Sequence, residues 1–202
     1  MPNWDVSQVT DMNNAFYNRI DFNGDISSWN VSSVTNMYSM FRDANAFNQP
    51  IGDWDVSSVT SMVGMFDDAD AFNQPIGDWD VSSVTDMSAM LKESSSFNQP
   101  IGDWDVSSVT SMSSMFIESY FNQPIGDWDV SNVTNMSGMF NAFDFNQPIG
   151  DWDVSNVTDM SAMFAGANAF NQAIGDWDVS SVTNMDSMFT NAYEFNQDIS
   201  NW

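Results

Sequence analysis

Pairs of aspartates around a tryptophan are the side chains of this sequence whose types and spacing could do chemistry. In the stretch FNQPIGDWDVSSVT, residues 47–60, Asp53 and Asp55 flank Trp54. In an extended segment, residues i and i+2 face the same way, about 6.5–7 Å apart. Carboxylate oxygens suit Ca²⁺ or Mg²⁺, and paired carboxylates can also hydrolyse glycosides. Six copies carry the full pair: Asp53 and Asp55, Asp78 and Asp80, Asp103 and Asp105, Asp127 and Asp129, Asp151 and Asp153, Asp176 and Asp178.

Catalysis is the less favoured use of these pairs. The chain has no His and no Cys, which removes most arrangements of nucleophile and base. A glycosidase needs one pair whose surroundings differ from the others, whereas these pairs are repeated alike. We therefore expect a protein that is not an enzyme.

The net charge of the chain limits its partners. There are 28 acidic residues against three basic ones, which gives a formal charge of −25. Nucleic acids and anionic membrane surfaces are not expected as partners, because both favour clustered Lys and Arg. No apolar run is long enough to span a bilayer, so this segment is not expected to insert into a membrane. Cations and basic protein surfaces are the partners that the charge favours.

The carboxylates carry two open interpretations. Stacked at about 4.8 Å, each neighbouring pair repels by about 0.9 kcal/mol in a water-like dielectric. One interpretation is a solvated acidic face that prevents edge-to-edge pairing. The other is that divalent cations, Ca²⁺ foremost, bind along the columns, weakly at many sites or tightly at one.

The tryptophans mark an internal repeat that must position these carboxylates. The spacing between the nine tryptophans is 25 residues, with two intervals of 24, so the sequence predicts a stack of about eight coils. One domain is expected over residues 1–202. Its coils begin near Trp4, Trp29, Trp54, Trp79, Trp104, Trp128, Trp152 and Trp177.

The apolar spacing within one unit predicts a leucine-rich-repeat-like parallel β-solenoid. The pattern I-x-x-W-x-V at Ile51–Val56 has the spacing of a leucine-rich-repeat strand, which would turn Trp54 inward and the aspartates outward. The apolar residues from Val59 to Phe66 suit a 3₁₀ or short α turn with one face inward. Pro50 and Gly52 are expected to return the chain to the strand. Stacking would then align Trp, Val, Met and Phe in ladders inside.

An asparagine follows the phenylalanine of each unit. Stacked asparagines can hydrogen-bond the turns of neighbouring coils, so we expect a structural ladder. Its members are Asn48, Asn73, Asn98, Asn122, Asn146, Asn171 and Asn196.

The unit resembles the repeats of BspA-like bacterial surface proteins, in particular the branch found in mycoplasma-type lipoproteins. The residues that carry the resemblance are WDVSSVTSMVGMF (54–66), FNQPIGDWDVS (72–82) and FNQDISNW (195–202). The resemblance implies a leucine-rich-repeat-like solenoid displayed outside the cell, with adhesion as the usual role. It supplies no ligand and no catalytic residue.

Two functions are expected from the sequence. The first is an extracellular or cell-surface module for adhesion or protein binding, using either the aspartate face or the variable segment Asp67–Ala71. The second is a structural unit that polymerises end to end into surface filaments, because the chain opens near Trp4 and stops at Trp202 without polar capping repeats. In both cases we expect the segment to be part of a longer chain.

Overall fold

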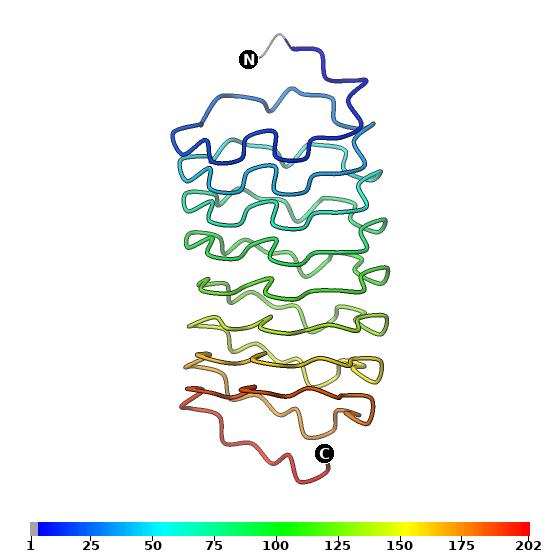
Figure 1. The fold of residues 1–202 in the computed structure, drawn as a ribbon, viewed down its shortest axis with the longest axis vertical. Coiled ribbons are helices and arrows are strands. Elements are labelled where there is room, and N and C mark those ends of the chain that lie inside the picture. The colour runs from blue at the N-terminus through cyan, green and yellow to red at the C-terminus, as the bar shows by residue number, and fades with distance from the viewer. Residues whose placement is uncertain (1–3) are drawn as a thin grey trace.

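The computed structural model describes residues 4–202, which form a stack of coils with the first and last described residues at opposite ends (Figure 1). Each coil is one repeat, so equivalent residues of successive repeats lie over one another. Within residues 4–202 there is no helix, and no strand extends beyond a single bridge residue. The isolated parallel bridges join Asp11 to Asn36, Asn36 to Ser61, Ser61 to Asp86, Asp86 to Ser111, Ser111 to Asn135, Asn135 to Asp159, and Asp159 to Asn184. The chain is a tandem-repeat protein.

The segment expected to form a 3₁₀ or short α turn instead joins the coils through its backbone. The N–H groups of Met62, Gly64, Phe66 and Asp68 donate to carbonyl oxygens of the next coil at 2.8–3.1 Å. The N–H groups of Met65, Asp67 and Ala69 donate to carbonyls three residues earlier, at 3.0–3.1 Å, and so close tight turns. The helical prediction is therefore wrong, because alternate N–H groups bond to the neighbouring coil.

These tight turns place two residues of most coils in the left-handed backbone region. Gly64 and Asp68 have φ of 58° and 57°, as a turn with positive φ at its third residue requires. Most members of these two positions are non-glycine residues, at a cost of about 1 kcal/mol each. The non-glycine members are Asn14, Asn18, Ser39, Asp43, Asp68, Ala89, Glu93, Ser114, Glu118, Ala162, Ser187 and Asn191.

The strand expected over Ile51–Val56 is not present either. The Trp54 N–H donates to the Ile51 carbonyl at 3.1 Å, and the Val59 N–H donates to the Val56 carbonyl at 2.8 Å. Both bonds lie within one coil, so this segment has no ladder to its neighbours. The predicted alternation nevertheless holds, since Trp54 and Val56 are buried and the aspartates beside Trp54 are exposed. Side-chain packing therefore sets the alternation here.

The core is one cluster of stacked side chains running from Val6 to Met188. Phe66 and Phe72 stack within one coil with their ring centroids 3.9 Å apart, and Phe66 lies 5.6 Å from Phe41 of the preceding coil. The predicted interior ladders of Trp, Val, Met and Phe are confirmed. Their burial stabilises the stack by about 1.5–3 kcal/mol for each large side chain.

The glycine before each aspartate pair lies in a turn, as predicted, and has a second role. A Cβ on Gly52 would lie 2.5 Å from the carbonyl oxygen of Pro75 in the next coil, closer than atoms in contact can come. Glycine is therefore needed there because two backbones approach each other. The same close approach to the next coil is repeated at Gly77, Gly102, Gly126, Gly150 and Gly175.

Candidate functional site

The D-W-D pairs are held at the surface by the tryptophan between them. The Trp79 indole N–H donates to the Ile51 carbonyl of the preceding coil at 3.1 Å, and 4% of the Trp79 residue surface is exposed. The same bond fixes each later tryptophan at 3.1–3.3 Å. All twelve aspartates of the sequence prediction are exposed on the two sides of this tryptophan ladder.

The second aspartate of each pair closes a local turn. Oδ1 of Asp80 accepts the Ser82 backbone N–H at 3.1 Å and the Ser82 hydroxyl at 2.6 Å. These bonds, the hydroxyl's first, lower the pKa of the Asp80 carboxyl, while burial and the like charge of Asp55 act in the opposite direction. The same capping and the same lowered pKa recur at Asp55, Asp105, Asp129, Asp153 and Asp178. The carboxylates of the second aspartates therefore stabilise local turns of the fold.

The first aspartate of each pair has no such use. Within residues 4–202, these carboxylates accept no hydrogen bond and form no ion pair. We call them the open column: Asp53, Asp78, Asp103, Asp127, Asp151 and Asp176. Their acceptor capacity is free for a partner.

A shallow groove runs beside the open column. Its volume is about 330 Å³, and its lining includes Asp78, Asp103 and the prolines that precede them in the repeat, Pro75 and Pro100. Proline rings supply an apolar edge without an N–H donor, and the aspartates supply negative charge next to it. This combination suits an extended basic segment better than a compact polar ligand.

The carboxylates of residues 4–202 are not arranged to coordinate one cation together. Among residues 4–202, no group of three or more acidic side chains is arranged around one metal position. Ca²⁺ takes six to eight oxygen ligands, so a cation at these columns would keep most of its ligands from water. The Ca²⁺ hypothesis thus remains a prediction for weak, repeated binding.

The predicted asparagines bridge neighbouring coils. The side-chain oxygen of Asn48 accepts the backbone N–H of Asn73 at 3.0 Å and Nε2 of Gln74 at 2.8 Å. Equivalent bonds connect the whole series up to Asn196 and Gln197. These oxygens are already used between coils, so the asparagine ladder is a structural element.

Sequence reasoning missed an ion-pair column at the variable segment. Arg42, Asp67 and Lys92 occupy one repeat position in three successive coils, with Arg42 Nε at 3.2 Å and Lys92 Nζ at 3.4 Å from the Asp67 carboxylate. Burial raises the pKa of Asp67, and the two cations act against this rise. Aligning the charges by the 25-residue period would have revealed the column. Two of the three basic residues are thus paired inside the chain.

The rest of the variable segment is also acidic, and its groups interact with other residues of the chain. The Asn45 amide donates to Asp70 Oδ2 at 3.0 Å and to the Asp68 carbonyl at 3.1 Å. Burial first, and then the charges of Asp70, Asp43 and Glu93, raise the pKa of Asp68. The variable segment is therefore less available to a partner than the open column.

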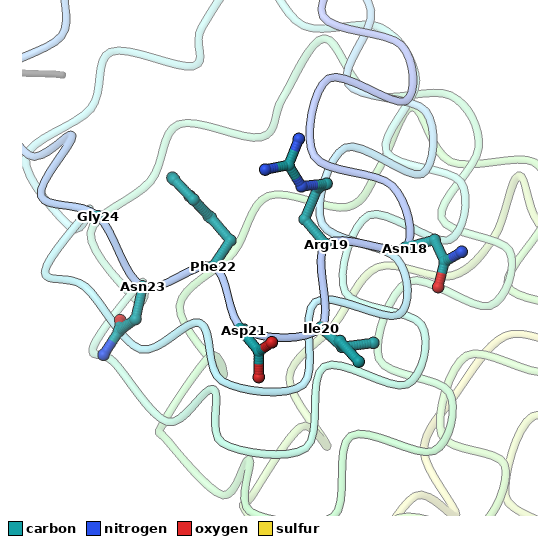
Figure 2. A pocket seen from close by; sticks show the side chains of 7 residues that line it. All are labelled: Asn18, Arg19, Ile20, Asp21, Phe22, Asn23 and Gly24. Carbon is teal, nitrogen blue, oxygen red and sulfur yellow. The ribbon is translucent and has the colours of Figure 1, made fainter.

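One open cavity lies at the amino-terminal end. It has a volume of about 600 Å³ and is lined by residues 18–24. Figure 2 shows Arg19 and Phe22 on one side of the backbone, with Asp21 and Ile20 on the other. The cavity is the open hollow of the first coil, and its side chains do not converge on a reacting position.

Fold and surface together define a non-globular repeat protein with an acidic face. The family described as Mycoplasma protein of unknown function, DUF285, matches residues 1–99, 74–158 and 118–202. The chain belongs to this family, in agreement with the mycoplasma-type part of the resemblance. No curated protein and no solved structure matches the chain. No helix among the described residues could cross a membrane.

Proposed function

We propose that the chain is a non-enzymatic module of the cell surface that adheres to partner proteins through a basic, extended segment bound along the open column. The observation that carries this proposal is the row of exposed carboxylates that have no hydrogen-bond or ion-pair partner among residues 4–202. The resemblance to BspA-like surface repeats supports an extracellular location.

Charge supports the choice of a basic partner. Arg42 and Lys92 are paired with Asp67, so the formal charge of −25 has little cationic side-chain compensation elsewhere. A partner carrying Lys or Arg reduces the repulsion between coils and gains ion pairs at the open column. A field of one sign over a long surface also speeds the encounter with such a partner.

A labelled lysine-rich peptide tests this proposal by fluorescence anisotropy. We expect the double variant Asp78→Asn, Asp103→Asn to bind it about tenfold more weakly, because each exposed ion pair contributes up to about 1 kcal/mol. Raising NaCl from about 50 mM to about 300 mM should also weaken binding.

The matched control is the double variant Asp21→Asn, Asp144→Asn, which removes the same charge from exposed positions outside the open column. Its affinity should stay within about twofold of the unaltered protein. Equal losses in both variants would show that only net charge matters and would refute binding at the open column.

Divalent cations are proposed as weak, repeated ligands of the same face. Equilibrium dialysis with Ca²⁺, followed by thermal melting with and without chelator, tests this. Bound Ca²⁺ and a higher melting temperature are expected, because cations reduce the repulsion between stacked carboxylates. The absence of both effects would contradict the hypothesis.

The second candidate function is a unit that assembles end to end into surface filaments. The observation that favours it is the apolar surface at both ends of the stack, where Trp4 is 62% exposed and Met185 is 36% exposed, while the equivalent central residues are buried.

A further inference from the structure

We infer that a shallow groove beside Tyr38 binds a neutral sugar ring, the hexose unit of a longer glycan. The inference goes beyond the proposed function, because it uses neither the open column nor a basic partner. It rests on the shape of the groove, on one break in the repeat and on the hydrogen-bonding groups that line the groove.

The groove crosses three neighbouring coils on the side where their backbones join. Its volume is about 450 Å³. Small-molecule pockets have volumes of about 300–1,000 Å³, so there is room for one sugar ring. The lining consists of Asn13, Thr35, Asn36, Tyr38, Thr60 and Ser61. None of these side chains is charged, although the chain as a whole carries a formal charge of −25.

Tyr38 departs from the repeat at its position. The equivalent residues of the other coils are Asn13, Val63, Ser88, Ser113, Ser137, Ser161 and Asp186. Tyr38 therefore lies between two smaller side chains, those of Asn13 and Val63, and it is 41% exposed. A binding site needs a position that differs from the other copies, and here an aromatic ring is offered to solvent in one coil only.

Hydrogen bonds within the chain hold the lining in place. Oδ1 of Asn36 accepts the Tyr38 backbone N–H at 3.0 Å, and Nδ2 of Asn36 donates to Oδ1 of Asp11 at 3.2 Å. The same Asp11 oxygen accepts the Asn13 backbone N–H at 2.9 Å. The backbone that carries Tyr38 and Asn13 is thus ordered before a ligand arrives, which lowers the entropic cost of binding.

The groups at the rim of the groove keep free hydrogen-bonding capacity. The side-chain amide of Asn13 and the hydroxyls of Tyr38 and Ser61 have no partner among residues 4–202. The hydroxyls of Thr35 and Thr60 donate to carbonyls of the preceding coil at 3.2 and 3.1 Å, and they keep their lone pairs. The groove therefore offers both donors and acceptors, all without charge.

This set of groups selects the chemical class of the ligand. Sugar hydroxyls both donate and accept, and the C–H face of a sugar ring packs against an aromatic ring. A cation finds more acceptors at the open column, and an anion is repelled by the net charge of the chain. A purely apolar ligand would leave the rim groups without partners. A neutral sugar satisfies the ring and the rim together.

Saturation-transfer NMR and titration calorimetry of the whole chain test the inference. The probes are the methyl glycosides of glucose, galactose, mannose and N-acetylglucosamine. We expect at least one to bind with a Kd of about 1–10 mM. Tyr38→Ala should weaken this binding at least about tenfold, because the ring is lost. Tyr38→Phe keeps the ring, so its loss should stay within about threefold.

The matched control is Tyr193→Ala, which removes another tyrosine, 77% exposed, from a distant coil. Its affinity for the glycoside should equal that of the unaltered protein. Circular dichroism of each variant checks that it folds. N-acetylneuraminic acid, an anionic sugar, should not bind, because the acidic surface repels it.

Salt and the open-column variant separate this inference from the proposed function. Glycoside binding should be unchanged by NaCl and by Asp78→Asn, Asp103→Asn, both of which weaken the binding of a lysine-rich peptide. The inference is overturned if none of the four glycosides binds at concentrations up to about 50 mM. Equal losses in Tyr38→Ala and Tyr193→Ala would overturn it as well.

Discussion

Two regions of the repeat join neighbouring coils by different means. In residues 60–68 and their equivalents, backbone N–H groups donate to backbone carbonyls of the adjacent coil. In residues 72–80 and their equivalents, the bonds between coils come from side chains, namely the asparagine, the glutamine and the tryptophan. We call them the backbone-joined and the side-chain-joined segments.

This difference explains why one half of the repeat is uniform and the other varies. FNQPIGDWDVS occurs unchanged five times, beginning at Phe47, Phe72, Phe97, Phe121 and Phe145. Apart from Thr60, whose hydroxyl donates to the Thr35 carbonyl of the preceding coil at 3.1 Å, the backbone-joined segment keeps only its inward residues, because any residue supplies an N–H and a carbonyl. Where a hydrogen bond between coils needs a particular side chain, the residue type is the same in the repeats.

The largest effect is expected for Gly102→Ala in the side-chain-joined segment. A Cβ there would lie 2.7 Å from the Pro124 carbonyl oxygen, so the coils must separate. We expect a loss of about 3 kcal/mol in the free energy of unfolding, measured by urea denaturation. Gly138→Ala in the backbone-joined segment is the control. Its loss should be about 1 kcal/mol, mainly from positive φ, because the nearest atom to its Cβ, at 3.2 Å, is the end of the flexible Ile117 side chain. Equal losses would contradict the close-approach explanation.

A smaller loss is expected for Asn98→Ala. Its side-chain oxygen accepts the Asn122 N–H at 3.0 Å and Gln123 Nε2 at 3.2 Å. Removing this acceptor should cost about 2 kcal/mol in urea denaturation, because two donors lose their partner. The control is Ser113→Ala in the backbone-joined segment, where a change within about 0.5 kcal/mol is expected. A comparable loss in the control would break the distinction between the two segments.

Ala89→Gly should stabilise the protein. Ala89 has φ of 55°, which glycine adopts without strain. We expect a gain of about 0.5 to 1 kcal/mol, since strain relief exceeds the added entropy of the unfolded chain. Ala69→Gly, at a buried position without positive φ, should instead lose about 1 kcal/mol. Destabilisation by both substitutions would show that the left-handed positions are not strained.

The smallest effect concerns acid sensitivity at Asp80. Hydrogen bonds from Ser82 lower the pKa of its carboxyl in the folded state, so its stabilising contribution is present above the unfolded pKa and lost as pH falls through the folded one. Between about pH 6 and about pH 3, the melting temperature of Asp80→Asn should fall slightly less than that of the unaltered protein.

Asp78→Asn is the matched control for this measurement. Its carboxylate accepts no hydrogen bond within the described residues, so the substitution removes none. An equal change in acid sensitivity for both variants would contradict the difference between the two aspartate columns.

Much of the coil could be predicted, because the repeat period and the apolar positions are visible in the sequence. The regular spacing of Trp54, Trp79 and Trp104 predicts a stack of coils, and the apolar residues of each repeat predict the ladders of buried side chains. The hydrogen-bond pattern could not be predicted in this way. Met62 and Met65 show the same apolar spacing whether their N–H groups bond within a helical turn or to the next coil, so periodicity alone does not separate the two.

The candidate site was predicted in part. The outward direction of Asp53 and Asp55 follows from their place beside a buried tryptophan. Their unequal use does not, since the Ser57 hydroxyl reaches Asp55 at 2.6 Å only once the turn has formed, while Asp53 has no partner among the described residues. The Arg42–Asp67–Lys92 column required aligning charges across coils.

By itself the sequence determined the repeat, its inward and outward faces, the acidic surface and the asparagine ladder, because these depend on residue type and on a fixed period. Only the tertiary structure decided which bonds join the coils and which aspartate of each pair is free. It also decided why glycine is required at position 52. These properties depend on distances between atoms of different coils, and such distances exist only after the coils have stacked.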